Sequence, residues 1–243
     1  MSWIPPRYLE SLVRRTNQIR YVWNEADLLQ VYSLPEGLDV KGLPWAGWVD
    51  AAICGFTIAT LEWPIFRLTP LDPDQTSRDA VEAAWCANID RRYAEGLEFS
   101  RREWTGPVRS PLLTCLNIMH EALFECLEAG ARPLHCPVIA CGLVEHLCAE
   151  SQSAFLAWRE QIIDRLDHFY QAPDPLVDLY GQAASKMIVA PQIFDPVLNF
   201  DIGQAPQLAD DFLRNVDYRS NPLLMSPQQM KQEGFEGVPY RYS

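Results

Sequence analysis

Residues 45–63, WAGWVDAAICGFTIATLEW, constrain the fold more than any other stretch of this chain. Asp50 and Glu62 are their only carboxylates, and almost nothing else in them is polar. A membrane span needs roughly 20 mainly apolar residues, but an aspartate inside one costs on the order of 3 kcal/mol. Of the basic residues, only Lys41 and Arg67 lie close. We therefore expect a central helix of a protein core, with the helix dipole favouring Asp50 in its first turn.

Apolar residues recur three and four positions apart through most of the chain, which is the period of an amphipathic helix. No alternating run of Val, Ile and Thr is long enough to predict a strand. The pattern indicates a mostly α fold, a compact bundle of about eight to ten helices. We treat residues 1–243 as a single helical domain, with the charged segment 97–109 as the candidate subdomain boundary.

Signals in the sequence for the starts and ends of helices divide the predicted bundle into its elements. Pro64 is expected to end the helix of 45–63, and Ser110-Pro111 and Ser226-Pro227 are typical helix starts. Gly130 stands where a helix should end. Residues 190–243 are rich in proline and irregular in pattern, yet three aromatic residues fall within 235–242. Disordered tails usually lack aromatic residues, so we expect this C-terminal segment to pack on the body.

The net charge of −12 is unevenly distributed. Residues 110–243 carry 8 basic and 17 acidic side chains, so this half should repel phosphate backbones and anionic lipid. The charge argues against nucleic-acid and membrane partners and favours a basic protein partner. The simpler alternative is that acidic side chains only keep the protein soluble.

Much of the negative charge falls between residues 160 and 217. If these side chains share one folded face, they would steer a basic partner toward it. The candidate partner-binding residues are Glu160, Asp164, Asp167, Asp174, Asp178, Asp210, Asp211 and Asp217.

The seven cysteines are odd in number, and most fall in apolar stretches. Free cysteines pack as small hydrophobic residues, which suits a reducing compartment. The first residues, MSWIPPRYLE, do not have the pattern of a signal peptide, so we expect a cytoplasmic protein. Cys136 and Cys141, with His135 and His146 nearby, only faintly resemble a zinc site, because paired CxxC spacing is absent. We predict no cofactor and no metal.

Catalytic motifs are missing. The sequence contains no Gly-x-Ser-x-Gly, no glycine-rich phosphate loop and no HExxH. Histidines and carboxylates on facing helices do build metal sites in bundles. If the chain were a small helical metal-binding protein or hydrolase, the candidate ligands would be His120, Glu121, His146, Asp164 and His168.

Three hypotheses follow. The first is a non-catalytic interaction protein whose acidic surface occupies a partner, as immunity or antitoxin-type proteins, adaptors and dedicated chaperones do. The second is the helical metal-binding protein or hydrolase. The third is a carrier of an apolar ligand, with residues 45–63 as a wall of its pocket.

Overall fold

A computed structural model describes residues 6–9, 19–173, 187–235 and 240. Its helices are joined by single 3-10 turns, and the described part of the chain contains no strand. The predicted mostly α class is confirmed. The helices are α2 (Glu25–Tyr32), α3 (Asp50–Leu68), α4 (Thr76–Ile89), α5 (Gly106–His120), a π-helical turn (Glu121–Glu125), α6 (Cys126–Glu128), α7 (Cys136–Leu147), α8 (Gln152–Phe169), α9 (Ala205–Leu213) and α10 (Pro227–Gln232).

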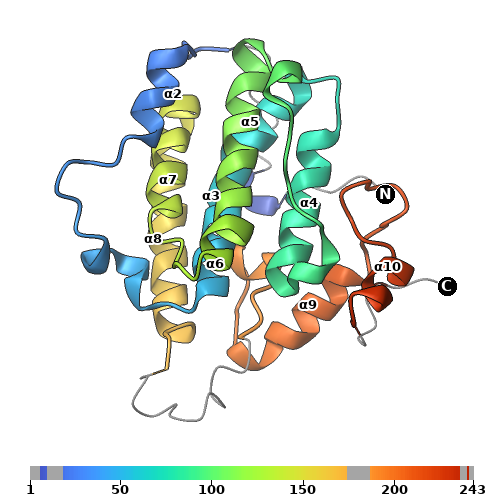
Figure 1. Ribbon diagram of the computed structural model, residues 1–243. Coiled ribbons are helices and arrows are strands. Elements are labelled where there is room, and N and C mark those ends of the chain that lie inside the picture. The colour runs from blue at the N-terminus through green and yellow to red at the C-terminus, as the bar shows by residue number, and fades with distance from the viewer. Residues whose placement is uncertain (1–5, 10–18, 174–186, 236–239, 241–243) are drawn as a thin grey trace.

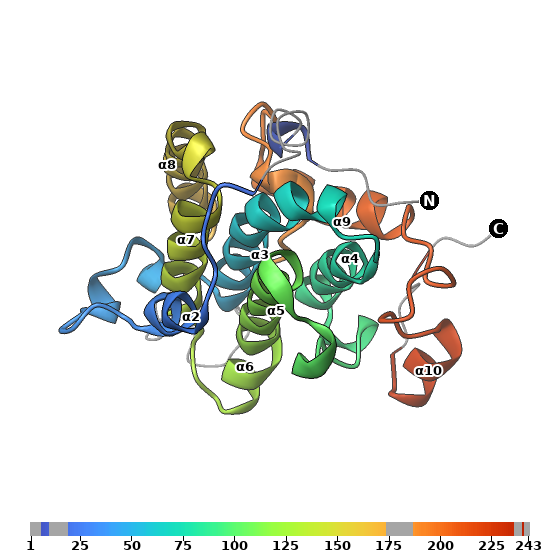
Figure 2. The same ribbon diagram turned by 90° about the horizontal axis from the view of Figure 1, so that it is seen from above.

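The central element is α3, which begins at Asp50 as the dipole argument predicts. It packs against α4, α5 and α7, and these helices surround it in Figures 1 and 2. Every residue from Ala52 to Leu68 is buried. Residues 50–71 are long and apolar enough to cross a membrane, but 94% of their most apolar window is buried inside the protein. The segment is therefore the core helix expected from the sequence.

Three predicted helix boundaries are wrong. The helix predicted over 45–63 begins only at Asp50, after a 3-10 turn at Pro44–Gly47. Pro64 does not end α3, which continues to Leu68. A proline inside a helix costs about 3 kcal/mol, whereas burying one large apolar side chain contributes about 1.5–3 kcal/mol; both Ile65 and Leu68 are fully buried. Similarly, α5 begins at Gly106 with Pro107 in its first turn, so Ser110 lies inside the helix rather than at its cap.

The irregular segment that follows residue 187 packs on α3 and α8. An added Cβ at Gly55 would lie 2.9 Å from Val189 and 3.1 Å from Phe194, so the missing side chain lets residues 187–194 lie directly on α3. On α8, Arg165 donates hydrogen bonds to the carbonyls of Asp195 (2.8 Å) and Leu198 (2.7 Å). These contacts confirm that the irregular segment packs on the body.

The end of the described chain and the cysteines also follow the prediction. The ring of Tyr93 lies 5.3 Å from those of Phe235 and Tyr240. All seven cysteines are free and buried. Leu97 and Trp104, in the candidate boundary 97–109, belong to the main hydrophobic core, while the division into subdomains itself stays a prediction. The spacing of Leu176, Leu179 and Met187 predicts a helix over about 175–189, which lies almost wholly outside the described residues.

Candidate interaction face

Helix α2 lies on the outside of the bundle, packed mainly against α7 (Figure 2). Asn24 begins it by accepting the amide hydrogens of Ala26 (2.8 Å) and Asp27 (3.2 Å), and Asp27 in turn accepts the amide of Asn24. The chain just before α2 is anchored too, because Nε2 of His146 on α7 donates to the carbonyl of Val22 at 2.8 Å. The helix thus has a fixed start and a largely uncovered outer side.

Exposed apolar side chains are concentrated in this helix and in the residues on either side of it. Six large hydrophobic residues are exposed in the described part of the chain, and four of them fall within residues 22–34. They are Val22 (71% exposed), Leu29 (65%), Leu34 (38%) and Tyr32 (37%). Single exposed apolar residues are normal, but a concentration of them is typical of a binding surface.

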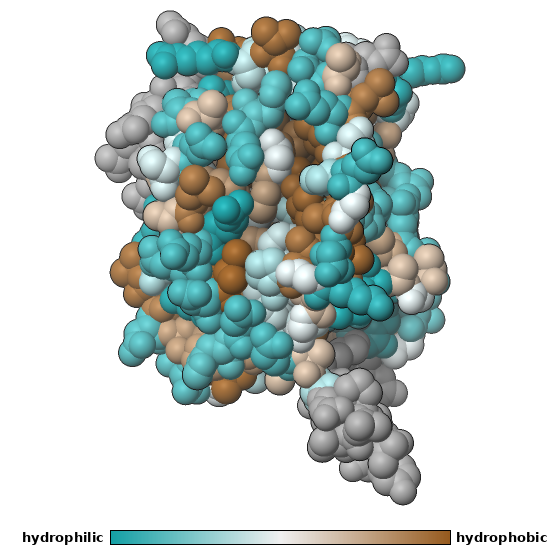
Figure 3. Space-filling view, turned by 90° about the vertical axis from the view of Figure 1, so that its left-hand side faces the viewer, coloured by the Kyte–Doolittle hydropathy of each residue, from teal (hydrophilic) through white to brown (hydrophobic). Residues whose placement is uncertain are grey.

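A groove of about 570 Å3 lies between α2, the turn after it, α7 and Arg159 of α8, and of the four exposed apolar residues Leu34 lines it. Its apolar lining comes from Val31, Leu34, Leu43, Trp45, Val138 and Ile139. Figure 3 shows this side of the molecule, where apolar side chains reach the surface between hydrophilic ones. Burial raises the pKa of Cys141, which also lines the groove, to about 11. That thiol is therefore neutral at physiological pH and adds to the apolar character of the groove.

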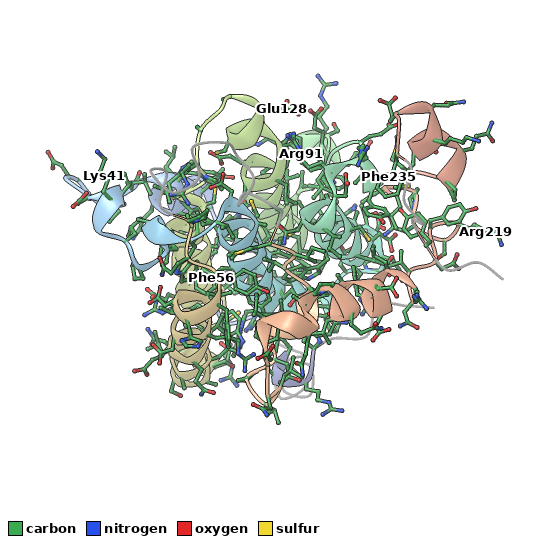
Figure 4. The ribbon with its side chains drawn as sticks, turned by 90° about the horizontal axis from the view of Figure 1, so that it is seen from below. Lys41, Phe56, Arg91, Glu128, Arg219 and Phe235 are labelled. Atoms are coloured by element: carbon green, nitrogen blue, oxygen red, sulfur yellow. The ribbon has the colours of Figure 1, made fainter. Side chains whose placement is uncertain are left out.

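The groove carries more negative than positive charge. Two carboxylates, Asp27 and Glu145, line it against the single guanidinium of Arg159. Glu36, Asp39, Lys41 and Glu160 are close in sequence to residues that line it. The guanidinium of Arg159 comes no closer than 3.9 Å to Glu145, and Lys41 extends away from the body in Figure 4. We name this surface, residues 22–45 together with the groove-lining side of α7 and Arg159, the α2–α7 face.

The predicted acidic residues on α8 lie near this face. Glu160, Asp164 and Asp167 are all exposed. Glu160 and Asp164 are one helical turn apart, and neither forms an ion pair with a residue that the structure describes. Asp167 accepts hydrogen bonds from Nε1 of Trp48 (2.5 Å) and from Gln171 (3.2 Å), so it has a structural role.

The remaining acidic candidates make local contacts. Asp210 pairs with Arg214 one turn along α9, and Asp211 accepts a hydrogen bond from Gln207 at 2.8 Å. Asp217 accepts the backbone amide of Arg219 at 3.2 Å. Asp174 and Asp178 lie outside the described residues. Whether any of these carboxylates binds a partner stays a prediction.

Of the predicted metal ligands, four lie apart from any ligand cluster. Nδ1 of His120 accepts the amide of Leu97 (3.2 Å), His146 is bonded to Val22, and His168 and Asp164 are exposed on α8. Among the described residues, one group brings three or more metal-binding side chains together. Of the five predicted ligands, this group includes only Glu121. Its members are Glu121, Cys126, His135 and Cys136. Of the four residues that faintly resemble a zinc site in the sequence, His135 and Cys136 belong to this group, and Cys141 and His146 do not.

A second pocket, of about 610 Å3, lies at the start of α3. Trp48, Val49, Ala51 and Cys54, all from the apolar segment 45–63, form part of its wall. The ion pair between Arg132 and Asp50, at 2.8 Å, neutralises two of its charged residues. An apolar ligand is the one this environment would favour.

Comparison of the chain with models of known protein families, with curated proteins and with solved structures found no match. The functional argument therefore depends on the chemistry of the surfaces and clusters described above.

Proposed function

We propose that this chain is a non-catalytic cytoplasmic interaction protein that binds a basic protein partner through the α2–α7 face. The observation that carries the proposal is that the segment 22–34, which has four exposed apolar side chains, also forms one wall of a groove lined by more carboxylates than guanidinium groups. An amphipathic helix with an apolar ridge and lysines or arginines beside it is the chemistry that fits such a groove.

The two features of the face contribute differently. Leu29 and Leu34 would lose contact with water on binding, which supplies affinity at about 25 cal/mol per Å2 of apolar area. The carboxylates of Asp27, Glu145 and Glu160 would attract a basic partner over a distance and raise its association rate. Glu160 and Asp164 extend the negative surface along α8.

Immunity or antitoxin-type proteins and adaptors or chaperones have this kind of activity, in which one protein occupies the surface of another. The proposal needs no nucleic acid, membrane or cofactor. It also needs no activated nucleophile, which agrees with the raised pKa values of Cys54, Cys115 and Cys148, whose burial is the main cause.

A second candidate is the apolar-ligand carrier, which the pocket at the start of α3 supports. Native mass spectrometry of protein purified gently from its own host would detect a retained small molecule. A clean mass of the bare chain would argue against this candidate.

Affinity purification from the native host tests the interaction proposal. The bait variant Leu29→Ser/Leu34→Ser removes two exposed apolar groups from the face. Its matched control, Val197→Ser/Ile202→Ser, removes the two exposed apolar groups elsewhere in the described chain, which are 78% and 37% exposed. We expect a stoichiometric basic protein with the wild type and the control but not with the first variant. Recovery of no such partner at low salt, or equal recovery with both variants, would contradict the proposal.

A further inference from the structure

Four metal-binding side chains converge on the other side of α7, outside the α2–α7 groove. Glu121 begins the π-helical turn, Cys126 begins α6, His135 caps α7 and Cys136 is the first residue of α7. One carboxylate oxygen, one imidazole nitrogen and two sulfur atoms all lie within 4.8 Å of one another.

The π-helical turn explains how Glu121 and Cys126 come together. Residues five apart point roughly 140° away from each other on an α-helix with 3.6 residues per turn. Here the amide of Cys126 bonds to the carbonyl of Glu121, five positions earlier, and this wider turn puts both side chains on one side. Such turns cost regular hydrogen bonding and are found frequently at functional sites.

The loop after α6 brings His135 and Cys136 back to the same place. Gly130, with φ of +68°, ends the helix, and the amide of Ala131 bonds to the carbonyl of Cys126 at 2.7 Å. Arg132 then fixes the loop on the start of α3, donating to Asp50 (2.8 Å) and to the carbonyl of Ala46 (2.6 Å). Below α6, Glu128 pairs with Arg91 at 2.8 Å, and Figure 4 shows these two side chains close together. The cluster is therefore held in place by its surroundings.

The geometry does not suit nucleophilic catalysis. Nε2 of His135 donates to Oε1 of Glu121 at 2.6 Å and also lies 3.7 Å from Sγ of Cys136. In a catalytic triad the histidine uses one ring nitrogen for the nucleophile and the other for the acid. Here the same nitrogen faces both, together with a second sulfur, so the four donors point toward one common position.

We propose that Glu121, Cys126, His135 and Cys136 form a four-coordinate zinc site. Two thiolates and an imidazole select zinc over magnesium or calcium, which prefer oxygen ligands. Ligands about 2.0–2.3 Å from a tetrahedral zinc ion lie roughly 3.3–3.8 Å apart. The histidine–cysteine distance already fits, and the hydrogen bond between Glu121 and His135 opens by less than about 1 Å to admit the ion.

The site is structural, because four protein side chains fill the coordination sphere and leave no open position for a substrate. Cys126 and Cys136 are buried, whereas Glu121 and His135 are each 28% exposed, so the ion enters from the side of the carboxylate and the imidazole. Once bound, it connects the end of the α5–α6 helix to the start of α7 across the loop 129–135. This inference is independent of the partner proposed for the α2–α7 face.

Titration of the metal-free chain with zinc, in competition with a chromophoric chelator, tests the site. We expect one zinc ion per chain, and cobalt(II) in its place should give thiolate-to-metal charge-transfer absorption. Cys126→Ser and Cys136→Ser should each weaken zinc binding at least about tenfold. Cys141→Ser, which removes a buried thiol outside the cluster, should leave it unchanged.

The cysteine variants could fail to fold because both thiols are buried. Glu121→Gln and His135→Gln are therefore tested as well, since both positions are partly exposed. With helix content unchanged by circular dichroism, each should also weaken zinc binding at least about tenfold. Absence of zinc binding to the wild type would overturn the proposal. Zinc binding that is unchanged in all four cluster variants would also overturn the proposed zinc site.

Discussion

The hydroxyl of Tyr8 donates a 2.5 Å hydrogen bond to the carboxylate of Glu62 in the middle of α3. Nε1 of Trp85 donates to the other oxygen at 2.8 Å. Glu62 is fully buried and forms no ion pair with any described lysine or arginine. Burial raises its pKa to about 7, although the hydrogen bonds from Tyr8 and Trp85 work against that shift. Glu62, the second carboxylate of segment 45–63, is thus a titrating group inside the core.

Stability should fall as the pH rises from about 4.5 to about 7. In this window the folded state holds the Glu62 proton and the unfolded state has released it, so raising the pH favours unfolding. The full effect is on the order of 3 kcal/mol. Glu62→Gln should remove most of this slope and stabilise the protein above pH 7. Urea unfolding at several pH values measures it.

Burial also raises the pKa of Glu82, which has the same sign of effect, so a smaller slope should remain in the Glu62 variant. Glu82→Gln is the natural companion variant. An unchanged slope in Glu62→Gln would show that this carboxylate does not titrate in the core as its surroundings imply.

Two glycines inside helices should respond oppositely to alanine. At Gly55 a new Cβ would meet the short, stiff side chain of Val189 and the buried ring of Phe194. We expect Gly55→Ala to destabilise the fold by about 1–3 kcal/mol. Gly142 on α7 has open space around it, so Gly142→Ala should stabilise by about 0.5–1 kcal/mol. Denaturant midpoints of the two variants provide the comparison, and equal signs would contradict the close approach at Gly55.

Arg165 should matter far more than its neighbour Arg159 on α8. Its guanidinium donates to several carbonyls of residues 193–198, and hydrogen bonds from a charged donor contribute about 1.5–3 kcal/mol each. We expect Arg165→Ala to cost on the order of 3 kcal/mol. Arg159→Ala loses a 3.9 Å contact with Glu145 and a guanidinium contact 5.8 Å from the centre of the Phe155 ring, together worth about 1 kcal/mol. Calorimetric unfolding distinguishes them, and similar costs would count against this anchoring role.

Local signals in the sequence predicted much of the fold. Asn24, Gly130 and Ser226 act at helix ends as their residue types imply, because caps depend on a few neighbouring atoms. Pro64 misled the prediction because tertiary burial of Ile65 and Leu68 outweighs a local cost. Rules based on the local sequence do not include the free energy of tertiary burial.

The candidate sites were harder to foresee. Residues 121 and 126 face apart on a regular helix, and only the π-helical turn joins them, so spacing rules pass over this pair. The exposed side of α2 could not be predicted for another reason. In the sequence, Leu29 and Tyr32 are typical of core residues, and only the fold shows that they are exposed. The net charge of −12 describes the whole chain and does not show which carboxylates lie beside an apolar groove.

Photo-crosslinking in the native host tests the central claim most directly. A photoreactive amino acid replaces either Leu34, on the α2–α7 face, or Ile202, whose exposure is nearly the same at 37% against 38%. We predict a crosslinked product containing a basic protein from position 34 and none from position 202. No product at position 34, or the same products from both positions, would contradict the assignment of this face to a partner.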